Sequence, residues 1–337
     1  GEETMVQRDR RQNRRGGKGG QGAGQRRGGG LSKSQASTIA MQTMDILDKG
    51  WYHAPSGVHV TVVDSVKAAT DNTVLYTPEQ IGAEFSARCK AHGIAARRER
   101  FRRLPAQTVI DVRAQTTIQA LEMLWNEQET AVTVDKATPR GIIGALNFAS
   151  AKNPGGGFIN GARAQEESIA RSSGLYTSLT APGVQLYYRE NKKESTCIYT
   201  DHVIFTPECP LFKDDFGVLR EQPMLVSFIS APAVNAGVAR KRMAYHDGPE
   251  EVIRDRMETR IRHVLDIAAE NEIDQLVLGA FGCGVFRNDP AVVAAIFNNL
   301  LLREGYAECF SRVVFAIPGR VEDNLNAFLA HNWAVNN

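Results

Sequence analysis

The sequence has few cysteines, and they show none of the spacings that structural cysteines have. Its five cysteines, in a chain of 337 residues, are odd in number and scattered, and no Cys-x-x-Cys pair occurs. We therefore expect neither a disulfide framework nor a zinc site, and we expect a reducing, intracellular compartment. The seven histidines show no ligand-like spacing either. No metal and no cofactor are expected.

Long hydrophobic runs are also missing. No apolar stretch approaches the roughly 18–20 residues that a transmembrane helix requires, so no membrane contact is expected. The first residues are basic but lack the apolar segment of a secretory signal.

A strong overall charge is lacking too, since the formal net charge is only +2. Residues 1–35 carry nine Lys/Arg against three Asp/Glu, which leaves about −4 for the remainder. The main body is therefore no general nucleic-acid binder. Residues 1–30 are mostly Arg, Gly and Gln, and we expect a disordered tail preceding one domain at 31–337. The tail resembles RGG-type segments that contact RNA or polyanions weakly, although it has no aromatics for stacking; a merely solvated tail is the alternative.

Within residues 31–337, strand-like and helix-like patterns alternate. This order predicts an α/β domain with a largely parallel or mixed sheet covered on both faces. The expected helices are Ser34–Lys49, Thr77–His92, Thr116–Asn126, Glu251–Glu270, Pro290–Leu302 and Glu322–His331; Arg97–Arg103 is expected to be an exposed charged stretch. The expected strands are Val58–Val63, Gln107–Val112, Ala131–Val134, Ile142–Phe148, Cys197–Phe205, Met224–Ile229, Gln275–Gly279 and Arg312–Ile317.

The most informative stretch follows the expected strand Ile142–Phe148. It contains Gly155, Gly156 and Gly157 in succession, and seven residues later Gln165, Glu166 and Glu167. Successive glycines let the backbone approach a ligand and direct several N–H groups one way. Adjacent carboxyls can transfer protons. The pattern suggests a ligand with phosphate and sugar that is processed by an acid, although acids are also common at helix N-termini for electrostatic reasons.

A second glycine-rich loop, GAFGCGVFRNDP from Gly279 to Pro290, lies between an expected strand and an expected helix. Orphan N–H groups at such a helix start favour an anion. The loop fits neither the Walker nor the Rossmann pattern, and a purely structural role is the alternative. Two such loops at the carboxyl ends of neighbouring strands could hold one diphosphate between them.

These motifs resemble those of a known family. GGG, seven residues and QEE, together with GAFGCGVFRNDP, are similar to the signature of bacterial-type poly(ADP-ribose) glycohydrolases, which are built on a macrodomain. The stretches HVIFTPECPLFKDD (His202–Asp215) and SFISAPAVNAG (Ser227–Gly237) fit the same group. The resemblance extends from about Leu31 to the C-terminus. One departure is Phe281, where the family often has Trp; we expect it to pack in the core.

The resemblance implies a macrodomain-like three-layer fold, with a mixed, mostly parallel sheet flanked by helices and an N-terminal helical extension. It implies that ADP-ribose binds in a cleft at the strand ends, with Glu167 as the catalytic acid and Glu166 helping to hold the ribose. The glycine triplet and the loop Gly282–Phe286 would enclose the diphosphate. The implied substrate-binding residues are Asn153, Gly155, Gly156, Gly157, Gln165, Gly282, Cys283, Gly284, Val285 and Phe286.

The implied activity is hydrolysis of ribose–ribose O-glycosidic bonds in poly(ADP-ribose), by exo-cutting that releases ADP-ribose. Two alternatives stay open: a hydrolase of ADP-ribose attached directly to protein or nucleic acid, and a reader that binds ADP-ribose without cutting it. Expected partners are poly(ADP-ribose) and ADP-ribosylated proteins, and the chain is expected to act as a monomer. A nucleophilic role for Cys283 is the weaker interpretation of that thiol, because no partner histidine is identifiable.

Overall fold

A computed structural model describes residues 30–102, 107–245, 247–319 and 322–335. The predicted Arg/Gly-rich tail, apart from Gly30, lies outside the described residues. Among the described helices, none is both long enough and apolar enough to cross a bilayer.

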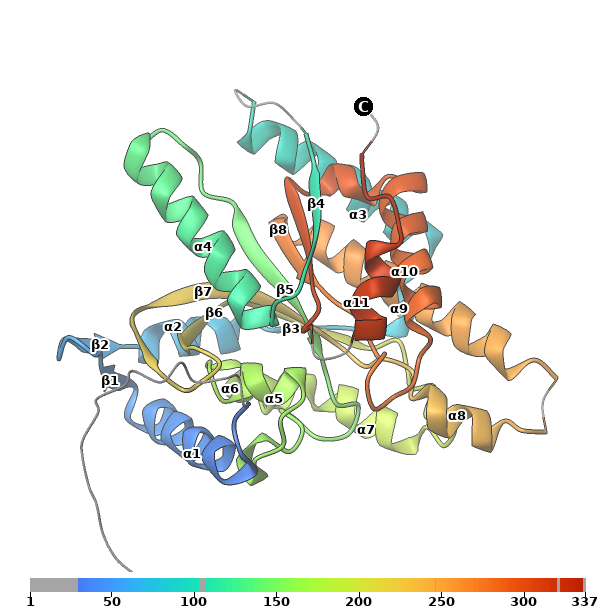
Figure 1. The fold of residues 1–337 in the computed structure, drawn as a ribbon, viewed down its shortest axis with the longest axis horizontal. Coiled ribbons are helices and arrows are strands. Elements are labelled where there is room, and N and C mark those ends of the chain that lie inside the picture. Colours follow the sequence, from blue (N-terminus) through green and yellow to red (C-terminus); the bar gives the residue numbers. More distant parts are fainter. Residues whose placement is uncertain (1–29, 103–106, 246, 320–321, 336–337) are drawn as a thin grey trace, which may run out of the picture. The chain divides into compact units, whose positions relative to one another are not determined.

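The centre of the domain is a seven-stranded sheet in which most neighbouring strands are parallel (Figure 1). β6 runs antiparallel to its neighbours β3 and β7, and the other neighbouring strands pair in parallel. The predicted mixed, mostly parallel sheet is therefore confirmed. In spatial order the strands are β3 (Val74–Tyr76), β6 (Val203–Lys213), β7 (Leu219–Ala231), β5 (Ile142–Phe148), β8 (Ile273–Leu278), β9 (Arg312–Ala316) and β4 (Val109–Arg113).

Helices cover both faces of this sheet, and alternate residues of β9 are buried on opposite faces. Val313 and Phe315 belong to one core, whereas Val314 and Ala316 belong to the core on the opposite face. Strands buried on both faces are apolar throughout, which is why the sequence identifies them as continuous runs. The first core includes α3 (Ala83–Arg100), α8 (Ala236–Arg242), α9 (Pro249–Glu270), α10 (Pro290–Asn298) and α11 (Glu322–Leu329); the second includes α2 (Val63–Asp71), α4 (Thr117–Val134), α5 (Gln165–Ala170), α6 (Leu175–Leu179) and α7 (Gln185–Lys193).

Local signals explain where several helices begin and end. Ser32 caps α1 (Lys33–Lys49) through a reciprocal capping box with Gln35, and Gly50 ends the helix with a φ of 81°. Glycine is favoured there because a left-handed conformation strains residues with a Cβ. Thr116 caps α4 in the same manner as Ser32, and Asp289 caps α10.

The N-terminal extension consists of α1, α2 and a separate two-stranded sheet of β1 (Trp51–His53) and β2 (His59–Thr61). α1 contacts the turn after the glycine triplet, where the Ser37 hydroxyl donates to the Ile159 carbonyl at 2.8 Å. It also contacts β6, because the buried Lys213 ammonium donates to the Thr43 hydroxyl at 2.8 Å. The extension is thus fastened directly to the loop that carries the predicted site.

Several expected elements differ from the structure. The predicted strand Ala131–Val134 is the last turn of α4, and the predicted helix Thr77–His92 is split into a 3₁₀ turn and α3. Arg97 is not exposed: it is buried, and its guanidinium donates to the Thr108 hydroxyl at 2.9 Å. The predicted strand Cys197–Phe205 begins only at Val203, and the preceding residues form a loop described below.

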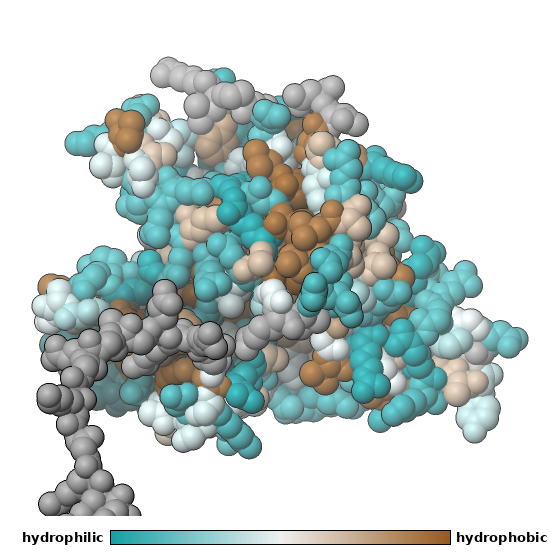
Figure 2. All heavy atoms as spheres, in the orientation of Figure 1, coloured by the Kyte–Doolittle hydropathy of each residue, from teal (hydrophilic) through white to brown (hydrophobic). Residues whose placement is uncertain are grey.

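Hydrophobic side chains also reach the surface. On the face drawn in Figure 2 they gather beside β4 and α11.

Candidate active site

The predicted site begins where β5 ends. The Gln165 side chain accepts a hydrogen bond from the Phe148 N–H at 2.8 Å and donates to the Leu146 carbonyl at 2.7 Å and to the Thr117 hydroxyl at 3.1 Å. Gln165 therefore ties the first turn of α5 to the end of β5. The two glutamates that follow it are held on this anchor.

The glycine triplet lies directly against those glutamates. Gly155 and Gly156 have positive φ values, 69° and 60°, whereas Gly157 has a φ of −102°. A Cβ on Gly156 would lie 2.4 Å from Glu167 Oε1 and 3.4 Å from Glu166 Oε2. Both carboxylates therefore converge on the same backbone position, which no residue other than glycine fits without strain.

Glu166 is buried, with 3% of its surface exposed. Its carboxylate accepts from the Ser150 N–H at 2.6 Å and from the Asn147 amide at 3.4 Å. Burial raises the pKa of the Glu166 carboxyl to about 8, the hydrogen bond from Ser150 lowers it, and the charge of Glu167 raises it. Burial therefore favours the protonated form of the Glu166 carboxyl, and the donors from Ser150 and Asn147 hold it in place.

Glu167 is bonded on one side only. Its Oε1 accepts from the Gly157 N–H at 3.2 Å. Its Oε2 is buried and has no hydrogen-bond partner in the part of the chain that the structure describes. A buried carboxyl oxygen without a partner is costly, which makes it an available acceptor for a ligand hydroxyl or, when protonated, a donor to a glycosidic oxygen.

The second glycine-rich loop is held by Asn288. Its side-chain amide donates to the Val234 carbonyl at 2.8 Å and to the Gly282 carbonyl at 2.9 Å. Gly282 has a φ of 72°, and a Cβ there would lie 2.6 Å from both the Ala233 Cβ and the Asn288 Nδ2. The loop is thus packed tightly at its base, while a Cβ on Gly284 would meet open space.

The tip of this loop offers backbone donors. The N–H groups of Gly284, Val285 and Phe286 make no hydrogen bond to any acceptor among the described residues. The Val285 side chain is 88% exposed, and Phe286 is partly buried. Successive free N–H groups form a concavity that suits an anion. The side chain of Asp289 accepts from the Ala291 N–H at 2.9 Å and so caps α10 itself, which leaves the loop amides, not the helix start, as the free donors.

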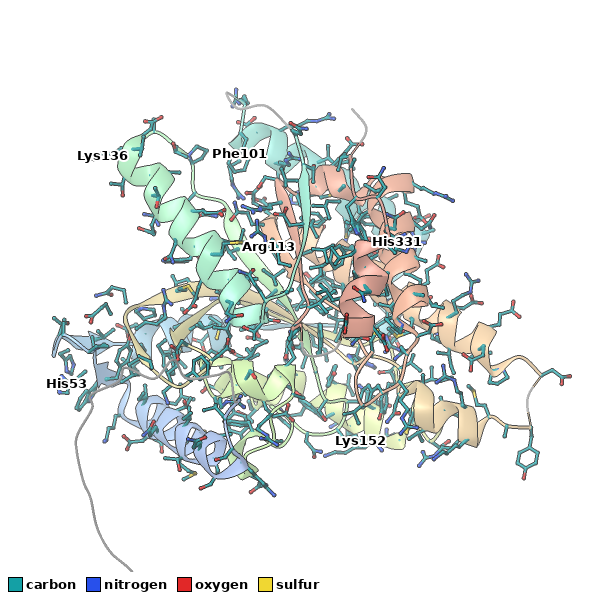
Figure 3. All side chains as sticks on the ribbon, in the orientation of Figure 1. His53, Phe101, Arg113, Lys136, Lys152 and His331 are labelled. Atoms are coloured by element: carbon teal, nitrogen blue, oxygen red, sulfur yellow. The ribbon has the colours of Figure 1, made fainter. Side chains whose placement is uncertain are left out.

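A cavity of about 420 Å³ lies beside both loops, at the carboxyl ends of β5, β8 and β9. Of the predicted site residues, it is lined by Gln165, Gly282, Gly284, Val285 and Phe286. The glutamates and the triplet are not among the residues that line it. A larger cavity of about 700 Å³ lies at the amino ends of the same strands, and Phe101 is one of the residues that line it. Figure 3 shows Phe101 far from Lys152, which belongs to the first glycine loop.

Two further predictions concern side chains near the loops. Phe281 is fully buried and packs against the Phe148 ring, with centroids 5.4 Å apart, so its predicted core role is confirmed. Cys283 is buried, and burial raises the pKa of its thiol to about 12, which disfavours the thiolate that a nucleophile requires. Asn153 is exposed in the turn before the triplet, where its carbonyl accepts from the Gly156 N–H at 3.0 Å.

The sequence did not identify other residues that line the cavity. The Thr116 hydroxyl donates to the Asp215 carboxylate there, although Thr116 was expected only as a helix start. Asp215 falls in the stretch His202–Asp215, which was noted only for the family it resembles. Missed lining residues also include Ile118, Ile317, Pro318 and Asn324. Among the described residues, no group of three His, Cys, Asp or Glu is arranged to hold a metal ion.

Two adjacent carboxyls against a glycine triplet, and a second loop with free amides at the end of a neighbouring strand, suit a glycoside hydrolase whose substrate carries an anion. The family model "Microbial-type PARG, catalytic domain" matches residues 40–214, more than half of the chain. The chain therefore belongs to the microbial-type poly(ADP-ribose) glycohydrolase family and is a glycoside hydrolase that acts on poly(ADP-ribose).

Solved structures agree with this assignment. The chain is similar to poly(ADP-ribose) glycohydrolase from Thermomonospora curvata bound to the inhibitor ADP-HPD, with a TM-score of 0.71, 38% identity, and coverage of 88% of this chain and 98% of the other. It is also similar to the enzyme from Deinococcus radiodurans in complex with ADP-ribose, with a TM-score of 0.63, 40% identity, and coverage of 78% and 94%. The macrodomain-like fold implied by the motifs is thus confirmed. A search of curated proteins gave no match.

Proposed function

We propose that the chain releases ADP-ribose from the end of poly(ADP-ribose), with Glu167 delivering the proton to the leaving oxygen. The observation that carries this proposal is the unpartnered, buried Oε2 of Glu167 beside Glu166, whose carboxyl is held by the Ser150 N–H. The transition state is oxocarbenium-like, so the enzyme must protonate the leaving oxygen and direct water to C1. In this step the protonated Glu167 carboxyl donates its proton from Oε2 to the leaving oxygen as the bond to C1 breaks, and the resulting carboxylate accepts a proton from the water that attacks C1.

In this proposal Glu166 holds the terminal ribose and the second loop holds the diphosphate. The free N–H groups of Gly284, Val285 and Phe286 suit phosphate oxygens, and Phe286 packs on the ribose side. Asn153, at the exposed turn, contacts the distal ribose. The ADP-ribose complex of the Deinococcus radiodurans relative and the ADP-HPD complex of the Thermomonospora curvata relative support a site for ADP-ribose.

We further propose that residues 31–337 form one catalytic domain that acts as a monomer inside the cell on poly(ADP-ribose) and ADP-ribosylated proteins. All five cysteines are free and buried, which suits a reducing compartment. Residues 1–30 would add at most a weak contact with RNA or another polyanion. Deleting residues 1–30 should leave the activity on short polymer unchanged, and a large fall would contradict this division.

The test compares the wild type with Glu167→Gln, which keeps the size of the side chain. Both are incubated with poly(ADP-ribose) of defined length, and free ADP-ribose and shortened chains are separated by chromatography. We expect free ADP-ribose to appear from the first minutes with the wild type only, while ADP-ribose affinity, measured by calorimetry, stays within about tenfold. Early appearance of oligomers instead of ADP-ribose would contradict exo-cutting. Full activity of Glu167→Gln would remove Glu167 as the acid.

A further inference from the structure

The loop that precedes β6 has an unusual backbone. Cys197 and Tyr199 have φ values of 64° and 65°, although neither is glycine. A residue with a Cβ costs roughly 1–3 kcal/mol in this conformation and persists there only when its surroundings hold it. The sequence suggested a strand here because the residues are apolar or β-branched. The structure instead stores strain in a loop close to the second glycine-rich loop.

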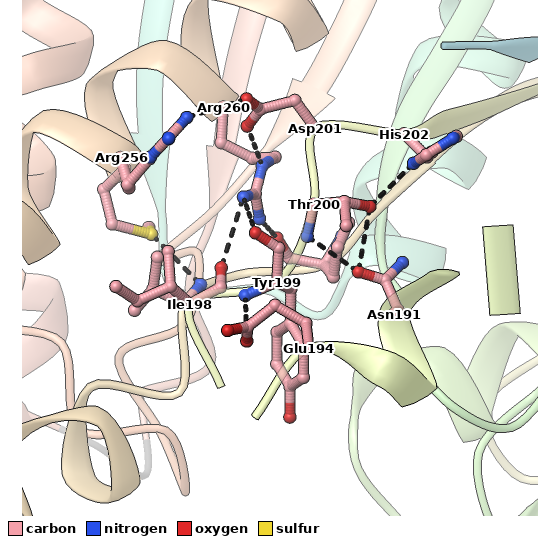
Figure 4. Close-up of polar contacts among 12 residues, drawn as sticks. Asn191, Glu194, Ile198, Tyr199, Thr200, Asp201, His202, Arg256 and Arg260 are labelled. Atoms are coloured by element: carbon pink, nitrogen blue, oxygen red, sulfur yellow. Dashed lines mark hydrogen bonds and ion pairs between the residues drawn. The ribbon is translucent and has the colours of Figure 1, made fainter. Parts of the chain in front are cut away.

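Arg260 of α9 holds this loop from inside the protein. Its side chain is fully buried, and its guanidinium donates to Asp201 at 3.0 Å, to the Ile198 carbonyl at 3.2 Å and to the Tyr199 carbonyl at 3.3 Å. It also donates to the Pro232 carbonyl. Figure 4 shows the guanidinium surrounded by these acceptors. Moving the Arg260 side chain would break hydrogen bonds and leave buried, charged N–H donors unsatisfied, which is costly. These contacts therefore hold the side chain in one position.

The amide side of Tyr199 is fixed as well. The Glu194 carboxylate accepts from the Tyr199 N–H at 3.0 Å, and the Asn191 side chain accepts from the Thr200 N–H at 2.8 Å. Tyr199 is therefore held at both its N–H and its carbonyl. These contacts fix the backbone of Tyr199 and so the direction of its Cα–Cβ bond, and Figure 4 shows the side chain extending away from the Arg260 guanidinium.

That side chain meets the second glycine-rich loop. The rings of Tyr199 and Phe286 have centroids 6.4 Å apart and planes inclined by 44°, within the range of an attractive aromatic pair. Phe286 lines the cavity, whereas Tyr199 does not. A second link joins the two loops through the start of α8, because the Asn235 N–H donates to the Cys197 carbonyl at 2.9 Å and the Gly237 N–H donates to the Phe286 carbonyl at 3.0 Å.

We propose that Tyr199, held by the loop that Arg260 fixes, is a positioning residue that sets the orientation of Phe286 over the cavity. This inference rests on the proposed function insofar as Phe286 packs on the terminal ribose. Tyr199 touches no substrate. It limits the rotation of the Phe286 ring, so the ribose meets a preformed wall when it reaches Glu167.

A double-mutant cycle tests the proposal. Steady-state release of ADP-ribose is measured for the wild type, Tyr199→Ala, Phe286→Ala and the double variant. Tyr199→Ala should lower kcat about five- to tenfold, the size of one aromatic pair, and change KM less than about threefold. In the Phe286→Ala background the same change should lower kcat less than about twofold, since the residue that Tyr199 acts upon is gone.

Two matched variants separate positioning from general damage. Tyr199→Phe keeps the ring and should retain kcat within about twofold of the wild type. Tyr245→Ala removes a tyrosine that is 99% exposed and should have no effect. Equal losses from Tyr199→Ala with and without Phe286 would overturn the proposal and mean that Tyr199 only stabilises the fold.

A readout independent of activity distinguishes this inference from the proposed function. Protein labelled with 4-fluorophenylalanine gives a ¹⁹F resonance for position 286, which Phe286→Leu assigns. Tyr199→Ala should shift and broaden this resonance, and Tyr245→Ala should leave it unchanged. If the wild type releases no ADP-ribose, the proposed function fails while the shift still supports positioning. An unchanged resonance in Tyr199→Ala would overturn the positioning role whatever the activity.

Discussion

The two glycine-rich loops follow neighbouring parallel strands, β5 and β8, yet they use their backbone amides in opposite ways. In the first loop the Gly156 N–H is bonded to the Asn153 carbonyl and the Gly157 N–H to Glu167. In the second loop the amides from Gly284 to Phe286 have no acceptor among the described residues. The first loop therefore holds the acids, and the second is open to an anion.

Glycine is required in both loops, but for a different reason in each. At Gly156 the reason is the Glu167 carboxylate, which fills the space that a Cβ would take. At Gly282 the reason is packing against Ala233 and Asn288 at the base of the loop. We therefore propose different roles for two loops that look alike in sequence: the first positions the glutamates for proton transfer, and the second binds the anionic part of the ligand.

The largest expected effect belongs to the first loop. Gly156→Ala places a Cβ 2.4 Å from Glu167 Oε1 at a φ of 60°, which must displace the carboxylate. Because misplacing a catalytic group by about 1 Å can cost roughly 100-fold in rate, kcat should fall by about that factor. ADP-ribose affinity should stay within about threefold, as measured by calorimetry. The control is Gly284→Ala, whose Cβ meets open space; similar activity for the two variants would contradict the comparison.

The second loop should respond in affinity. Gly282→Ala introduces contacts of 2.6 Å with Ala233 and Asn288 at a φ of 72°, so the loop must shift and its amides move with it. We expect ADP-ribose to bind about tenfold more weakly, the cost of roughly 1–2 kcal/mol of strain and displacement. Calorimetry on the variant and on Gly284→Ala measures this. If Gly282→Ala kept its affinity and lost only kcat, the division between the loops would be wrong.

The Glu166 carboxyl, which lies against the first loop, predicts how the stability of the protein depends on pH. The pKa of Glu166 is about 8 in the folded protein, above the usual value of about 4.3 that the unfolded chain has. The folded state thus binds the proton more tightly, and this contribution to stability is complete below about pH 4 and is lost as pH rises to about 8. Relative to Glu166→Gln, the wild type should lose roughly 2–4 kcal/mol of unfolding free energy between pH 5 and pH 8.

Urea denaturation at both pH values measures that loss. The control is Glu84→Gln, which changes an exposed carboxyl and should leave the pH dependence of the wild type in place. A parallel pH dependence in the wild type and Glu166→Gln would show that the carboxyl is not desolvated in solution.

Much of the fold could be predicted from the sequence where one local signal decides the structure. β5 begins and ends at the predicted residues Ile142 and Phe148, because a strand buried on both faces is a nearly continuous apolar run, interrupted here by the buried Asn147. α1 ends at Gly50 as expected, because its left-handed cap favours glycine. The error at Ala131–Val134 has an equally local cause: β-branched residues favour a strand, but α4 continues through them.

The site could be predicted only in part. The spacing of the triplet and the glutamates suggested that the two lie together, as they do in the structure. It did not show that the Gln165 side chain would hold β5, because that contact appears only in three dimensions. Thr116 and Asp215 were missed because the cavity joins α4 to the end of β6, about 100 residues apart in sequence. Arg260 and Tyr199 were missed for the same reason.

The smallest expected effect sharpens the view that the second loop acts through its backbone. Val285 is 88% exposed, and its amide is one of the free donors. Val285→Ala removes most of the side chain and keeps the N–H, so ADP-ribose affinity and kcat should both stay within about twofold, in line with the small effect of exposed substitutions. Calorimetry and initial rates, run beside Gly282→Ala as the positive control, measure both quantities. A tenfold loss of affinity in Val285→Ala would show that the side chain itself contacts the ligand, and the loop would then bind through an apolar contact as well as through its amides.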